Sequence, residues 1–244
     1  MNSKHIKPVL IIFLLGLFIQ FVSCKKGDDD GYESYRYELW KICISNNYNI
    51  DFVGMQYDDG NYPDFNGFSF DRDHEGIGGI ETEGVLVNID EVLQQVNDLN
   101  IVLLCIGGND LLNGTNDPQT AIDNIHLIID AIQNAQPNVT IFIEKIAPGN
   151  NEIMTPEFQL KIDEFNQLIA ALAPIQTNAN SNVIAVDMYT GFTENLLADD
   201  VHYNQEGAHF IAERYFNAIS SSFNSNTTLT ILPLGDSRVE GARP

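Results

Sequence analysis

Ser237 stands where a serine hydroxyl can act as a nucleophile. It follows an apolar run at residues 229–234 and is preceded directly by Gly235 and Asp236. The run predicts a short buried strand, and Gly-Asp-Ser after it predicts a strand-to-helix turn that exposes the serine. Because a free serine hydroxyl is a poor nucleophile, it needs a neighbouring base that accepts its proton.

The chain has five histidines that could supply this base. Three of them are poor candidates. His5 lies in an N-terminal segment that is expected to be removed, and His126 and His209 lie inside helical stretches. His202 follows Asp199 by three residues, so the carboxylate can hold one imidazole nitrogen while the other faces Ser237. His74 is the alternative base, and we expect it to structure its own loop or to face the substrate.

A tetrahedral intermediate also needs hydrogen-bond donors for its oxyanion. The side-chain amide of Asn109 and the backbone N–H groups of Gly79 and Ser237 are the candidate donors. Each motif alone is an ordinary turn sequence, and Asp199 alone could simply cap a helix. Together they predict a nucleophile, a base, an orienting acid and oxyanion donors at one rim of one sheet.

The elements that must position these residues alternate along the chain. Apolar runs typical of strands are found at residues 50–53, 101–106, 139–143, 183–186 and 229–234. Helical patterns fill the gaps, at 33–46, at 82–96, after the cap-proline pairs Asp117-Pro118 and Thr155-Pro156, and at 204–222. This alternation predicts a doubly wound α/β fold whose parallel sheet has helices on both faces. In such folds the functional loops lie at the carboxyl ends of the strands, where the candidate residues fall.

The N-terminus predicts export. Residues 1–23 combine a basic start with a short apolar run and read as a lipoprotein signal peptide that ends before Cys24, the expected site of lipidation. An ordinary secretory peptide with an incidental Cys24 is the alternative. Residues 24–31 then form an acidic tether, and residues 32–244 one domain. We expect a secreted lipoprotein at the outer membrane or cell surface, attached to the membrane through the lipid alone.

The acidic composition disfavours two classes of binding partner. With 12 basic and 34 acidic residues the formal net charge is −22, which disfavours nucleic acid and anionic lipid surfaces. Cys43 and Cys105 lie in a helical stretch and an apolar strand, where two buried free thiols are expected. No metal site and no cofactor is expected.

These residues resemble the SGNH (GDSL-like) hydrolase superfamily over nearly the whole predicted domain. Ser237 matches its serine, Gly79 its glycine, Asn109 its asparagine, and Asp199 with His202 its acid and base. The segments 31–40, 51–54 and 71–76 look like carbohydrate esterase family 3. The resemblance implies removal of acetyl groups from xylan or related sugars without a metal, and a flavodoxin-like sheet of five strands with the nucleophile strand between the strands at Ile50 and Ile101.

The chain order departs from that of the superfamily, in which the Gly-Asp-Ser strand comes first and leads into the helix that resembles residues 32–46. Joining Pro244 to about Gly31 would restore this order. The sequence therefore looks circularly permuted, with its nucleophile strand at the C-terminal end.

We predict a serine esterase that deacetylates a xylan-like polysaccharide through an acyl-enzyme intermediate. One alternative is a lipid or thioester hydrolase of the same superfamily, which would need an apolar acyl groove. The loop at residues 56–70 mixes Asp and Asn with aromatic residues, as sugar sites do. The other alternative is a surface glycan-binding lipoprotein with weak turnover, because the chain ends seven residues after Ser237.

Overall fold

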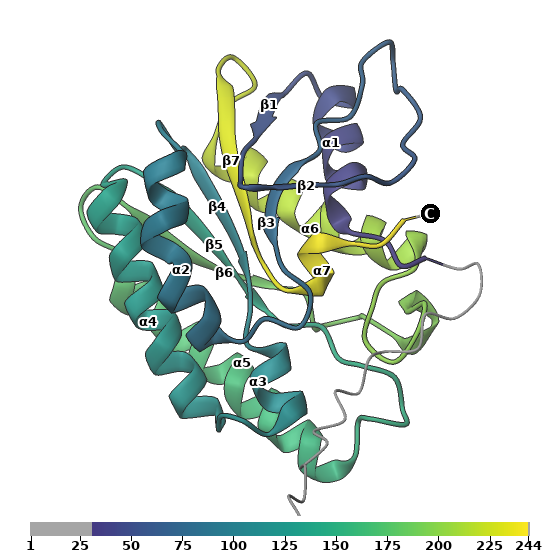
Figure 1. Cartoon of the computed structure of the whole chain (residues 1–244), viewed down its shortest axis with the longest axis vertical. Coiled ribbons are helices and arrows are strands. Elements are labelled where there is room, and N and C mark those ends of the chain that lie inside the picture. The colour runs from purple at the N-terminus through teal and green to yellow at the C-terminus, as the bar shows by residue number, and fades with distance from the viewer. Residues whose placement is uncertain (1–30, 244) are drawn as a thin grey trace, which may run out of the picture.

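A computed structural model describes residues 31–243 (Figure 1). The predicted signal peptide, the lipidation site Cys24 and nearly all of the tether lie outside the described residues. The described chain forms a central sheet with helices on both faces, which confirms the predicted α/β fold.

All five predicted strands are present and pair in parallel. They are β1 (Asn49–Phe52), β4 (Ile101–Cys105), β5 (Thr140–Lys145), β6 (Asn182–Asp187) and β7 (Thr228–Gly235). The predicted number of strands was wrong, because the sheet formed by residues 31–243 has seven strands. The additional strands are β2 (Gln56–Tyr57) and β3 (Asp73–Gly76), which pair antiparallel with each other. Neither could be recognised from an apolar pattern, since β2 has two residues and β3 reads Asp-His-Glu-Gly.

β7 lies inside the sheet although it follows every other strand in the chain (Figure 1). One edge of β7 pairs with β4 over Ile231–Gly235. Its other edge pairs first with β1, at Thr228–Ile231, and then with β3, at Leu234–Gly235. The nucleophile strand is therefore between the strands at Ile50 and Ile101, as predicted.

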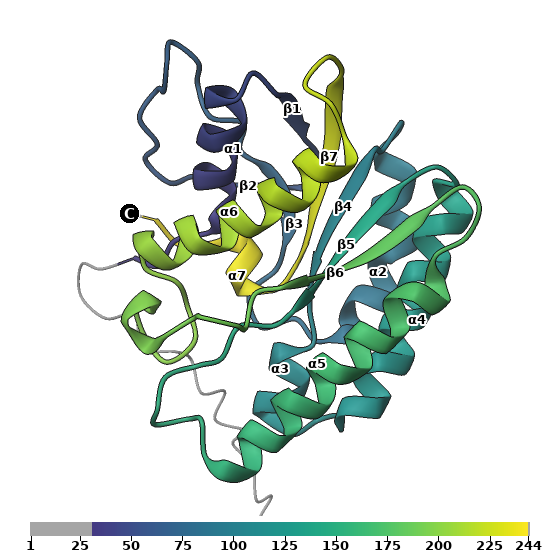
Figure 2. The same ribbon diagram turned by 180° about the vertical axis from the view of Figure 1, so that it is seen from behind.

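The long helices cover the two faces of the sheet (Figures 1 and 2). α2 (Thr82–Gln95), α4 (Pro118–Ala135) and α5 (Pro156–Gln176) pack on one face, and α1 (Tyr35–Ser45) and α6 (Gln205–Ser222) on the other. Alternate strand residues separate the two cores: Leu232 and Leu234 point into the first, whereas Leu229 and Ile231 point into the second. This is the period of two that a strand buried on both faces requires.

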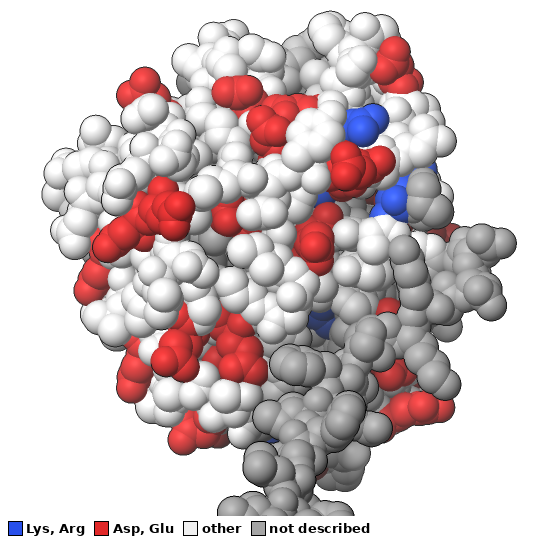
Figure 3. All heavy atoms as spheres, in the orientation of Figure 1, with Lys and Arg blue, Asp and Glu red and all other residues white. Residues whose placement is uncertain are grey.

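Three short helices complete the fold: α3 (Gly108–Asn113), a 3₁₀ turn at Glu194–Leu196, and α7 (Ser237–Glu240). Cys43 and Cys105 are buried free thiols, as predicted. Within residues 31–243, no helix is both long enough and apolar enough to cross a bilayer. Acidic side chains are spread over the face that Figure 3 shows, and few basic ones are seen there.

Candidate active site

The turn from β7 into α7 exposes Ser237 at the carboxyl edge of the sheet. Gly235 permits the turn, because a Cβ at this position would lie 1.9 Å from the backbone oxygen of Cys105 on the neighbouring strand β4. Asp236 then caps α7, and its carboxylate accepts the backbone N–H of Arg238 at 3.0 Å. Asp236 is buried while Ser237 is partly exposed, so the hydroxyl can meet a substrate.

His202 lies between Ser237 and Asp199. Its Nε2 is 2.8 Å from Ser237 Oγ, and its Nδ1 is 2.7 Å from Asp199 Oδ2. The other oxygen of Asp199 accepts the backbone N–H groups of His202 and Val201, at 2.7 and 2.9 Å. One carboxylate therefore holds both the ring and the backbone of His202. A serine, an imidazole and a carboxylate joined in this way can carry a proton away from the serine hydroxyl.

Asp199 is set up to remain ionised. Its partial burial alone would raise its pKa, but hydrogen bonds from the His202 ring and from the N–H groups of His202 and Val201 outweigh this effect. The pKa of Asp199 is consequently well below the usual range of an aspartate. A negative charge is thus favoured beside the imidazole at neutral pH.

Asn109, at the start of α3, and Gly79, in the turn before α2, lie in two segments that contact each other. Asn109, in the first turn of α3, donates from Nδ2 to the backbone oxygen of Ile80 at 3.0 Å. Gly79 belongs to the turn that the N–H of Ile80 closes on the oxygen of Ile77, and its φ of +75° is one that glycine tolerates best. Asp110 joins the two segments further, because its buried carboxylate accepts both the N–H and the hydroxyl of Thr82, the first residue of α2.

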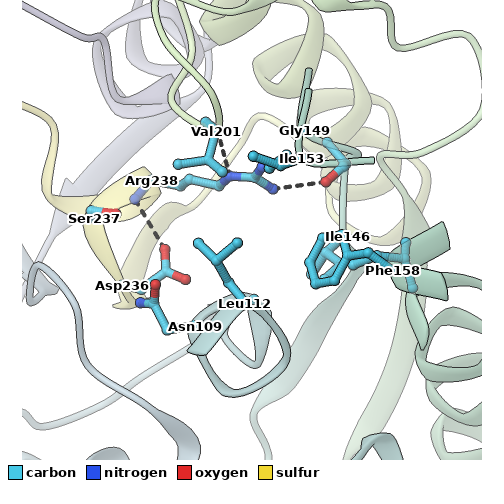
Figure 4. Close-up of a pocket in the computed structure, with 13 residues that line it drawn as sticks. Asn109, Leu112, Ile146, Gly149, Ile153, Phe158, Val201, Asp236, Ser237 and Arg238 are labelled. Carbon is cyan, nitrogen blue, oxygen red and sulfur yellow. Dashed lines mark hydrogen bonds between the residues drawn. The ribbon is translucent and has the colours of Figure 1, made fainter. Parts of the chain in front are cut away.

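Arg238, which was not among the predicted site residues, connects the turn at Ser237 to the loop that contains Val201 and His202 (Figure 4). Its buried guanidinium donates from Nε to the oxygen of Val201 and from Nη1 to the oxygen of Ala147, both at 2.9 Å. It also lies over the ring of Tyr203, next to His202. The only signal in the sequence was a basic residue adjacent to the candidate nucleophile.

A pocket opens beside Ser237 (Figure 4). It has a volume of about 40 Å³. Asn109, Asp236, Ser237 and Arg238 supply the polar side chains of its lining. The remaining wall is largely aliphatic and aromatic, with Leu112, Ile146, Ile153, Phe158, Ile162 and Val201. Such a space suits a short apolar group attached to a carbonyl at Ser237.

His74, the alternative base, is buried in β3 and its Nδ1 accepts the N–H of Gly76 at 3.0 Å. Burial, reinforced by the charge of Arg36, lowers the pKa of His74 to about 3. Asp71 stands three residues before it, but its carboxylate accepts the backbone N–H groups of Phe52 and Asp73 instead. The structure therefore favours a structural role for His74.

Beneath the serine turn, Glu144 of β5 is a buried carboxylate. Tyr215 donates its hydroxyl to Oε1 at 2.7 Å, whereas Oε2 has no hydrogen-bond partner among the described residues. Burial raises the pKa of Glu144 to about 7, against the opposing effects of Tyr215, Cys105 and Arg238.

In the described part of the chain, no group of three or more His, Cys, Asp or Glu side chains is arranged to hold a metal ion.

The chain is similar to one protein family and to several solved structures. The model of the GDSL-like Lipase/Acylhydrolase family matches residues 47–210. A family 3 carbohydrate esterase of Clostridium thermocellum is 31% identical, with a TM-score of 0.62 over 80% of this chain and 90% of that one. A carbohydrate esterase family 3 protein from Talaromyces cellulolyticus is 28% identical, with a TM-score of 0.68 over 78% and 90%.

A third similar structure is described as an acetyl esterase mutant with an acetate ion. It is also 28% identical, with a TM-score of 0.68 over 78% of this chain and 90% of that one. No curated protein matches the chain.

Proposed function

Because the chain belongs to the GDSL-like lipase/acylhydrolase family and is a carboxylic ester hydrolase, we propose that it removes acetyl groups from a polysaccharide through an acyl-enzyme at Ser237. The observation that carries this proposal is the unbroken hydrogen-bonded series from Asp199 through His202 to Ser237 at the mouth of a small pocket. We infer catalytic roles for these three residues from their geometry.

In the proposed mechanism, Ser237 Oγ attacks the acetyl carbonyl carbon while His202 Nε2 accepts its proton. Asp199 orients the ring and stabilises the imidazolium. The imidazolium then gives its proton to the ester oxygen of the sugar as the bond between this oxygen and the acetyl carbon breaks, so the sugar leaves as an alcohol. In the second half of the reaction His202 activates a water molecule, which releases acetate and regenerates the serine.

The oxyanion of each tetrahedral intermediate needs donors near Ser237. We propose the backbone N–H groups of Ser237 and Gly79 and the side-chain amide of Asn109. Asn109 Nδ2 carries two hydrogens and gives one to Ile80. Its second hydrogen is then the one directed at the oxyanion, while the bond to Ile80 fixes the orientation of the amide.

The acetyl group is proposed because the pocket is small and mostly apolar. The carbohydrate is proposed because two similar structures are described as family 3 carbohydrate esterases and a third as an acetyl esterase with an acetate ion. A xylan-like polymer is the substrate that we would test first. The aliphatic wall of the pocket favours a second candidate, an esterase for somewhat longer acyl chains such as those of lipids or thioesters.

The test is acetate release from acetylated xylan and from p-nitrophenyl acetate by the protein, by Ser237→Ala and by His202→Ala. We expect acetate from the unchanged protein and background release from both variants, whose circular dichroism should be unaltered. Turnover by Ser237→Ala comparable to that of the unchanged protein would refute the mechanism. A p-nitrophenyl ester series from two to eight carbons separates the candidates, since the acetyl esterase should lose kcat/KM as the chain lengthens.

Export and lipid attachment at Cys24 remain our prediction for residues outside the described range. Labelling with a radioactive fatty acid in a bacterium that processes lipoproteins, with Cys24→Ser as the control, tests it. Label that persists in Cys24→Ser would contradict the assignment.

A further inference from the structure

One face of the His202 imidazole is covered by an aromatic ring. The ring of Tyr32 stacks on it, with 3.9 Å between the ring centroids and 19° between the ring planes. The two nitrogens of the same imidazole already contact Asp199 and Ser237. Tyr32 therefore contacts the histidine that is hydrogen-bonded to Ser237. The contact uses the flat face of the His202 ring, whereas Asp199 and Ser237 contact its two nitrogens.

The backbone around Tyr32 is attached to both sides of the site. The oxygen of Tyr32 accepts the N–H of Ala242, just beyond the helix that begins at Ser237, at 3.0 Å. The N–H of Glu33 donates to the oxygen of Tyr203, the residue after His202, at 2.8 Å. Tyr32 is thereby held between the chain that leaves the serine helix and the loop that carries the histidine.

We propose that Tyr32 is a positioning residue for His202 in the ester hydrolysis described above. Its flat ring restricts rotation of the imidazole and excludes water from one face. The negative π face of an aromatic ring also favours a cation lying over it, and His202 becomes a cation when it accepts the proton of Ser237. The inference depends on the proposed function, because it assigns this role relative to His202 as the base.

Other charges also act on His202. Asp199 bonds to the ring, and the carboxylates of Asp236 and Glu240 act on it electrostatically. All three remain in any variant of Tyr32. A difference between variants that replace only this side chain therefore reports on the ring itself.

The experiment compares Tyr32→Phe with Tyr32→Leu. Phenylalanine keeps the stacked ring, whereas leucine keeps much of the apolar volume and loses the π face. We expect Tyr32→Phe to retain kcat within about twofold, and Tyr32→Leu to lose about 10- to 100-fold in kcat on p-nitrophenyl acetate with little change in KM, because loss of positioning affects the reacting geometry. The acid limb of the Tyr32→Leu profile should move to lower pH, since the imidazolium loses a stabilising partner.

Tyr48→Ala is the matched control. Tyr48 precedes β1 at the opposite end of the sheet from Ser237, where it bonds to the oxygen of Phe223 and packs on Phe216. The Tyr48→Ala substitution should lower the stability of the protein without changing kcat per folded molecule. The proposal would be overturned if Tyr32→Leu and the unchanged protein had equal kcat values and equal pH profiles. It would also be overturned if Tyr32→Leu raised KM alone, because Tyr32 would then be a substrate contact.

An NMR measurement separates this inference from the proposed function. The ring protons of His202 should resonate upfield in the unchanged protein and in Tyr32→Phe because of the stacked ring, and should move downfield in Tyr32→Leu. Activity of Ser237→Ala, measured in parallel, reports on the mechanism alone. An absent ring-current effect refutes the stacking, whereas an active Ser237→Ala refutes the mechanism.

Discussion

Among single residues, Asn109 gives the most direct test of the oxyanion site. Asn109→Ala should lower kcat about 100- to 1,000-fold, as loss of one oxyanion donor typically does. KM should change little, because the donor acts mainly on the charge of the transition state. Steady-state kinetics on p-nitrophenyl acetate measures both constants. An effect on KM alone would make Asn109 a substrate-binding residue instead.

Glu144 gives a prediction about stability and pH. Burial raises its folded-state pKa to about 7, above the ordinary value of a glutamate, so its contribution to stability is present in acid and is lost as the pH rises through about 7. Glu144→Gln cannot ionise. Between pH 5 and pH 8 the free energy of unfolding of the unchanged protein should therefore fall relative to Glu144→Gln, by on the order of a few kcal/mol.

Urea unfolding at the two pH values measures this difference. Glu164→Gln, an exposed glutamate on α5, is the control and should show no such dependence on pH. A constant difference between Glu144→Gln and the unchanged protein from pH 5 to pH 8 would show that Glu144 is not a buried acid of raised pKa.

Ser237, His202 and Asp199 could be predicted as one catalytic group from the sequence, because each follows a predicted strand and because their residue types suit one reaction. It could not predict Arg238 or Tyr32 as partners of the site. Tyr32 and His202 are far apart in the chain, and the contact arises only when the backbone pairs Tyr32–Ala242 and Glu33–Tyr203 form. Contacts of this kind carry no local pattern.

At the scale of elements, Gly235 decides whether β7 can lie against β4. Gly235→Ala would place a methyl group 1.9 Å from the oxygen of Cys105 and 2.9 Å from Val239. We expect separation of the two strands, a loss of at least about 2 kcal/mol in the free energy of unfolding, and impaired turnover because the serine turn moves.

Gly108→Ala is the control for stability, because the nearest atom to its new Cβ lies 3.7 Å away, at ordinary contact distance. Chemical unfolding of both variants measures the difference. Equal stability of Gly235→Ala and Gly108→Ala would contradict the close packing of β7 on β4.

The five parallel strands and the long helices were predictable because each has an apolar pattern of sufficient length. The same reasoning fails for β2, β3, α3 and α7, which have between two and six residues. Their structure depends on partners elsewhere in the chain: β3 pairs with the end of β7, and α7 depends on the turn at Gly235. Short elements at a functional rim are the ones that sequence periodicity does not detect.

For the whole molecule, we propose that the order of segments is a circular permutation of the family order. The N–H of Ala242 donates to Tyr32, and Arg243 lies 3.5 Å from the carboxylate of Glu33. The C-terminal segment thus lies beside the start of α1 (Figures 1 and 2). Placing residues 229–244 ahead of Tyr32, with Pro244 joined to it, should preserve the fold and the activity.

The gain in stability should be modest, about 1–2 kcal/mol, because loop-closure entropy varies slowly with length. Thermal unfolding and acetate release by the two arrangements, measured side by side, test this expectation. An unfolded or inactive rearranged protein, with the present order active, would show that the permutation had been misread.

The position of β7 has a consequence for how the protein folds. Asn49 and Thr228 are cross-strand neighbours that are separated by 179 residues, and β1 and β3 reach β4 only through β7. While the chain is being synthesised, β4, β5 and β6 can associate, but β1 and β3 have no sheet to join until β7 emerges. Such long-range pairing folds slowly. The sheet is thus completed in the same step that delivers the serine, so folding intermediates that lack β7 also lack the nucleophile.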